Sequence, residues 1–200
     1  LGVIRLLKLP FLNGMKTINM VRIIMRYYHH RIQSMTKHTI SLEHRYRNHG
    51  ARHILEVSFM IINFENKNII GTKDYYLHDD KFCDFKYNYY ENRIIFQTTT
   101  EDKSKMRTII FENVLGFQML SGDFWGRSPH IFDWELITME DDDPLLSKIM
   151  NNPDAKNVLD LRISSFDKCV ESKIYFTSGD TLDIVCEFIN YEVTPNEFYK

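Results

Sequence analysis

The chain has 200 residues, and its 44% hydrophobic and 14% aromatic content can build the core of one domain, or of one domain with an appendage. A formal net charge of -2 hides an uneven distribution, because residues 1–59 carry about +8 and residues 60–200 about -10. The acidic part argues against nucleic-acid binding, and three cysteines without a CxxC pair argue against a disulfide scaffold or zinc knuckle.

The first 59 residues are basic and apolar, and charges interrupt every window well before the roughly eighteen apolar residues of a membrane span. A transit peptide, a poor secretory signal or a membrane-surface helix would fit residues 1–34. The codons of Leu55-Glu56-Val57 can contain a bacterial ribosome-binding site just before Met60, which favours translation from Met60. We therefore expect residues 1–59 to be a basic leader, either outside the native protein or disordered or helical, and residues 60–200 to form a single β-rich domain.

The stretch from Leu77 to Leu120 has the longest two-residue hydrophobic rhythm in the chain. Rings alternate with polar residues from Phe85 to Tyr89, Glu91-Asn92 supplies turn chemistry, and apolar runs return twice before Leu120. Such alternation, broken by turn residues, is typical of half-buried antiparallel strands.

A loop rich in bulky rings, residues 124–130, precedes the next alternating run. In that run Phe132, Trp134 and Leu136 are expected to face the core of the domain.

Asp143-Pro144 marks the start of a short helix over residues 145–150, with Asp143 as the N-cap and Pro144 as the first helical residue. The acidic run 140–143 is more typical of a helix N-terminus than of a metal site.

Three more strands are predicted, at 159–163, at 170–176 and, after a hairpin turn at 177–180, at 182–188, where Cys186 is expected in the core. The polar tail 194–200 is expected to fray. Together these elements predict a mainly β fold, an antiparallel sandwich or curved sheet of about seven or eight strands with one short helix.

His78, Asp79 and Asp80 form the most suggestive polar cluster. A His-Asp pair occurs in metal phosphohydrolases, but the acidic part has only one other histidine, His130, which is too few for a multi-histidine site. Capping of nearby backbone amides by Asp79 or Asp80 is the simpler interpretation. We keep the three as candidate binding residues and expect no metal and no cofactor.

A small hydrolase-type enzyme is the alternative function. It would use His78 or His130 with nearby carboxylates such as Asp133 and Glu135, and it would need these groups in one pocket. Asp133 and Glu135 share one strand face opposite Trp134, which is also the pattern of a solvated face. Hydrogen-bonding reach among His78, His130 and Asp133 would favour the enzyme.

The run YLHDDKF, Tyr76 to Phe82, resembles the opening of small uncharacterised bacterial proteins that begin with an LHDxxI-type motif, with Phe82 in place of Ile. The run FENVLGF, Phe111 to Phe117, is similar to their F-x-x-V-x-x-F strand. Some of these proteins are encoded near polymorphic toxins, so the resemblance implies an immunity or accessory role with a protein toxin as partner. It brings no catalytic residues.

These observations predict a non-enzymatic, cytoplasmic protein-binding domain. The ring-rich loop supplies Phe124, Trp125 and Arg127 as candidate anchors, since Trp, Tyr and Arg carry much of the binding energy at interfaces. The alternative is that Trp125 closes one end of the sandwich as a core residue. Membrane contact is expected only if residues 1–34 are a real anchor, and the sequence leaves the oligomeric state open.

Overall fold

The computed structural model describes residues 2–5, 38–45, 52–120, 130–152, 154 and 166–196. The chain forms two compact units, Leu1–Phe59 and Met60–Lys200. In the smaller unit, β1 (Gly2–Arg5) runs parallel to β2 (His38–Arg45), and β2 pairs antiparallel with β3 (Arg52–Ile62). β3 crosses the boundary, so its last residues belong to the larger unit.

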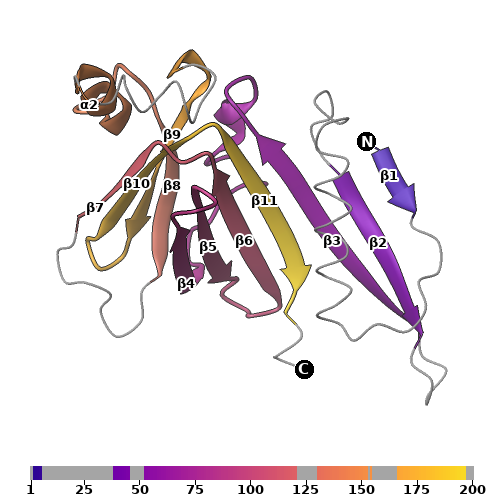
Figure 1. Cartoon of the computed structure of the whole chain (residues 1–200). Coiled ribbons are helices and arrows are strands. Elements are labelled where there is room, and N and C mark those ends of the chain that lie inside the picture. The colour runs from indigo at the N-terminus through magenta and orange to yellow at the C-terminus, as the bar shows by residue number, and fades with distance from the viewer. Residues whose placement is uncertain are drawn as a thin grey trace. The chain divides into compact units, whose positions relative to one another are not determined.

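The larger unit is mainly β, as predicted, and its described residues form nine strands in two antiparallel sheets with one α-helix (Figure 1). The first sheet has the order β3-β11-β6-β5-β4, with β4 at Lys81–Asn88, β5 at Arg93–Thr99, β6 at Lys105–Glu112 and β11 at Phe188–Pro195. The second has the order β7-β10-β9-β8, with β7 at Gly116–Leu120, β8 at Ile131–Ile137, β9 at Val170–Phe176 and β10 at Thr181–Cys186. The 3-10 turns η1 (Lys67–Ile69) and η2 (Phe166–Lys168) and the helix α2 (Leu145–Asn151) complete it.

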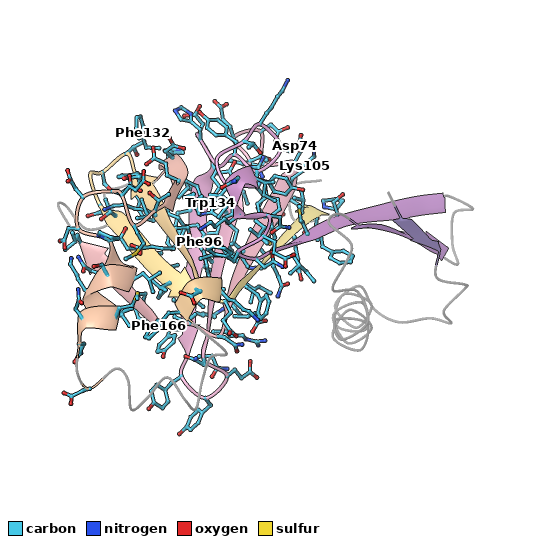
Figure 2. All side chains as sticks on the ribbon, turned by 90° about the horizontal axis from the view of Figure 1, so that it is seen from above. Asp74, Phe96, Lys105, Phe132, Trp134 and Phe166 are labelled. Carbon is cyan, nitrogen blue, oxygen red and sulfur yellow. The ribbon has the colours of Figure 1, made fainter. Side chains whose placement is uncertain are left out.

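The core lies between the two sheets, because alternate residues of the strands point into it. Its fully buried members come from both sheets and include Ile94, Phe96, Ile109, Phe111, Trp134, Ile174, Leu182, Ile184 and the predicted Cys186. Figure 2 shows Phe96 and Trp134 in this interior. Burying one such large apolar side chain contributes about 1.5–3 kcal/mol relative to leaving it exposed.

The chain changes sheet at Glu187, where a single continuous strand over 182–188 was predicted. β10 ends at Cys186, and Phe188 begins β11, which pairs with β6 in the other sheet. The prediction is wrong here because the buried positions shift at the corner, from Leu182, Ile184 and Cys186 to Ile189 and Tyr191, and the apolar residues of the sequence do not reveal this shift.

The tail was predicted to fray from residue 194, but the chain remains paired up to Asn196. Thr194 and Pro195 lie in β11, opposite Met106 and Lys105 of β6. The Asn196 N–H then donates to the Ser104 carbonyl at 2.8 Å, so pairing with the β6 hairpin extends past the strand. Residues 197–200 lie outside the described residues, as does the predicted strand 159–163.

Strand β8 contains a bulge at Phe132. Ile131 pairs with Phe176 and Asp133 with Tyr175, so Phe132 is the extra residue. Ile131 and Trp134 are therefore buried, whereas Phe132 is 56% exposed at the periphery (Figure 2). The predicted alternation is right for Trp134 and wrong for Phe132.

Helix α2 begins at Leu145 as predicted, but Asp143 does not cap it. Asp143 has a φ of +58°, and Pro144 precedes the first helical residue instead of being it. The Glu171 carboxylate on β9 accepts the N–H groups of Leu145 and Leu146 at 2.7 and 2.8 Å, which satisfies two otherwise unpaired donors. No helix in the described part of the chain is long and apolar enough to cross a membrane.

Candidate binding surface

The segment from Tyr75 to Asp80 alternates between buried anchors and exposed side chains. Tyr75, Leu77 and Asp80 are buried, whereas Tyr76 is 42% exposed and Asp79 is exposed. Asp79 adopts a φ of +65°, a conformation that Asn and Asp tolerate better than most residues. This turn interrupts the two-residue rhythm, so that Asp80 follows as another anchor.

Asp80 is held inside the larger unit by side chains that are distant in sequence. Its carboxylate accepts the Thr98 hydroxyl at 2.6 Å and pairs with the Arg107 guanidinium. Burial raises the pKa of Asp80, and the hydrogen bonds from Arg107 and Thr98 oppose that rise. The predicted capping of nearby backbone amides is therefore wrong for Asp80, which forms a buried ion pair instead.

Three rings pack beside this ion pair. The Tyr191 ring meets the Tyr75 ring edge-on at 5.2 Å and stacks on the Trp134 ring at 6.0 Å. Tyr191 also hydrogen-bonds to Arg107, and burial raises the pKa of Tyr191 to about 12. The anchors of the segment are thus fixed by both sheets.

Backbone hydrogen bonds join this segment to the start of β8. The Asp79 N–H donates to the Ile131 carbonyl at 2.9 Å, the Ile131 N–H donates to the Asp80 carbonyl at 2.8 Å, and Lys81 pairs with His130. The structure thus joins the predicted cluster His78–Asp80 to the end of the ring-rich loop. The other candidate anchors, Phe124, Trp125 and Arg127, lie outside the described residues.

The result is a surface formed by three rings and one carboxylate, here called the ring-stack surface. The rings are those of Tyr76, His78 and Phe132, and the carboxylate is that of Asp79. The His78 ring stacks on Tyr76 at 5.3 Å with 4° between the planes, and it meets Phe132 at 5.7 Å. The Nδ1 atom of His78 lies 2.9 Å from an Asp79 carboxylate oxygen, which orients the imidazole. The surface combines apolar ring area with one exposed carboxylate.

One group of the alternative enzyme has a hydrogen-bond partner outside the proposed set. Asp133 Oδ1 accepts the Trp134 N–H at 2.7 Å. Among the described residues, no hydrogen bond or ion pair joins His78, His130 and Asp133. In the same part of the chain, no group of three or more His, Cys, Asp or Glu is placed to hold a metal ion.

Sequence reasoning missed two rings of this surface, Tyr76 and Phe132. A signal for Tyr76 was present, because alternation from Leu77 places it on the outer side of the segment. No such signal exists for Phe132, whose exposure depends on the bulge in β8.

A second charged group lies on the face of the second sheet that points away from the core. Glu135, Lys173 and Asp183 are neighbours across β8, β9 and β10, and Lys173 Nζ lies 3.4 Å from Asp183 Oδ1. Burial raises the pKa of Asp183, and Lys173 opposes that rise.

Replacing Asp183 by Asn should change how stability depends on pH. The folded pKa lies above the unfolded value of about 3.9. The contribution of Asp183 to stability is therefore full below that pH and is lost as the pH rises through the folded pKa. The Asn variant should gain stability relative to the unsubstituted chain from about pH 4 upward, as measured by urea unfolding at several pH values.

Asp141→Asn provides a control of opposite sign. Hydrogen bonds from the Thr138 N–H and hydroxyl lower the pKa of Asp141, so its contribution is lost as the pH falls. The same pH trend in the Asp183 and Asp141 variants would contradict the assignment.

Comparison with known proteins found no relative of this chain. No protein-family model, no curated protein and no solved structure matches the chain. The resemblance of residues 76–82 and 111–117 to toxin-associated proteins stays a prediction, and the ring-stack surface and the charge distribution are the observations on which a function can be argued.

Proposed function

We propose that residues 60–200 form a non-enzymatic protein-binding domain, which acts as a bacterial immunity or accessory protein by occupying a protein toxin. The observation that supports this most directly is the ring-stack surface, where exposed Tyr76 and Phe132 both contact the ring of His78. Large rings of this kind are frequent among the few residues that carry most of the binding energy at interfaces.

The rings are held in position before a partner arrives. Leu77 and Asp80 anchor one side of the surface in the core, and two backbone hydrogen bonds tie that segment to Ile131 beside Phe132. A surface fixed in this way loses little conformational entropy on binding, so more of the contact energy appears as affinity.

The charge of the larger unit indicates the chemistry of its partner. Residues 60–200 carry about -10, and the exposed Asp79 carboxylate lies within the ring-stack surface. A basic toxin surface would be attracted, and the association rate should fall as salt rises because screening weakens the attraction. Stopped-flow mixing at low and high ionic strength measures this rate. A rate that ignores salt would contradict a basic partner.

Truncation of the rings tests the surface itself. Tyr76→Ala and Phe132→Ala should each weaken binding of the polypeptide encoded by an adjacent toxin gene by about 2 kcal/mol, with little change in the melting temperature. Calorimetric titration measures the affinity. Tyr90→Ala is the matched control, because Tyr90 is 98% exposed in the turn between β4 and β5 and should not affect binding. Equal losses in all three variants, or no binding by the unsubstituted chain, would refute the proposal.

A further inference from the structure

Among the described residues, strand β7 is an edge of the second sheet (Figure 1). It pairs with β10 on one side, and in the described part of the chain no strand pairs with its other side. Its residues, Gly116–Leu120, include no charge and no proline, and its register with β10 is unbroken. An uncharged edge strand without a bulge offers its free backbone groups to another strand.

Two other edge strands, β4 and β8, differ from β7 in this respect. β4 has a bulge between Phe82 and Asp84 and carries the exposed Lys86. β8 has its bulge at Phe132 and carries the exposed Glu135. Bulges and exposed charges are the devices that keep edge strands from pairing with other chains.

The sequence of β7 is complementary to itself. When two copies run antiparallel about a two-fold axis at Gln118, Phe117 lies opposite Met119 and Gly116 lies opposite Leu120. A thioether against an aromatic ring is a favourable contact. No pair in this register joins like charges.

Apolar groups on β7 are exposed where such pairing would cover them. Phe117 is 37% exposed and Leu120 is 53% exposed. The Phe117 ring also contacts Tyr87 of β4 at 5.1 Å, so the apolar area continues onto the other sheet. On the opposite face of β7, Ile149 of α2 lies against Gly116, where it would meet Leu120 of a second copy.

We propose that the protein forms a two-fold homodimer in which β7 pairs with β7 of a second copy, joining two four-stranded sheets into one continuous sheet. Each larger unit carries about -10, so a contact between two copies is favoured where it adds no like-charge pair, and β7 has no charged residue. β8 is the opposite edge of the same sheet, so the dimer leaves the Phe132 side open and does not depend on toxin binding.

Light scattering on the full chain tests the dimer. The mass should be twice the 24.0 kDa of one chain and should fall towards the mass of one chain on dilution. Gln118→Lys and Gln118→Glu each place two like charges at the axis and should raise the dissociation constant by about tenfold or more. Mixing the two variants should restore the dimer, because Lys then lies opposite Glu.

Lys86→Glu on the β4 edge is the matched control and should leave the dimer unchanged, with circular dichroism confirming that every variant is folded. A monomer mass at all concentrations would overturn the proposal. So would a dimer that is indifferent to the Gln118 variants, one that is lost in Lys86→Glu, or a mixture of the Gln118 variants that stays monomeric.

Discussion

Replacing Arg107 by Met should lower the free energy of unfolding by about 3–5 kcal/mol, because it leaves a buried carboxylate without its charge partner. Arg107 pairs with Asp80, whose side chain is almost fully buried, and also bonds to Tyr191. Nearby water cannot replace the lost partner at so enclosed a position. Urea denaturation, followed by circular dichroism, measures the loss.

Two variants show whether burial is the cause. Lys86→Met breaks an exposed pair with Asp84 at 2.6 Å and should cost less than about 1 kcal/mol. Adding Asp80→Asn to Arg107→Met should recover part of the loss, because the uncompensated charge is then removed as well. If Arg107→Met costs no more than Lys86→Met, the ion pair does not anchor the segment.

Most strands of the larger unit were predictable from the sequence, whereas β1 and β2 lie in residues 1–59, for which no strand was predicted. Alternation between Phe85 and Leu120 identifies β4 to β7, since a two-residue period follows directly from the geometry of a strand. Alternation carries no information about which sheet a strand joins, so the change of sheet at Glu187 could not be predicted. The bulge at Phe132 was hidden for a related reason, since it is set by pairing with β9.

The candidate site was less predictable, because its contacts are long-range. The Asp80–Arg107 pair spans 27 residues, and Glu171 caps a helix that starts 26 residues before it. Local sequence patterns predicted Asp143 as the helix cap and backbone amides as the partners of Asp80. In the fold, Glu171 caps the helix and the Thr98 hydroxyl donates to Asp80. The side-chain chemistry of His78 identified it in the sequence as a candidate binding residue. Its ring contacts with Tyr76 and Phe132 could be identified only from the fold.

Trp134→Ala should lower the free energy of unfolding by about 3–5 kcal/mol, as for other buried large rings. Trp134 is fully buried, and its ring stacks on Tyr191 at the centre of the core. Its Nε1 atom has no hydrogen-bond partner among the described residues, so the loss arises from packing and from the cavity. Trp134→Phe keeps a ring against Tyr191 and should therefore cost clearly less than the Ala variant, as measured by urea denaturation.

Phe132→Ala is the sharper comparison, because Phe132 lies two residues before Trp134 on the same strand. Strict alternation would bury both rings and make both substitutions costly. The bulge instead exposes Phe132, so its truncation should change stability by no more than about 0.5 kcal/mol. Similar losses for Phe132→Ala and Trp134→Ala would contradict the bulge. They would also remove Phe132 from the ring-stack surface, since a core ring is not available to a partner.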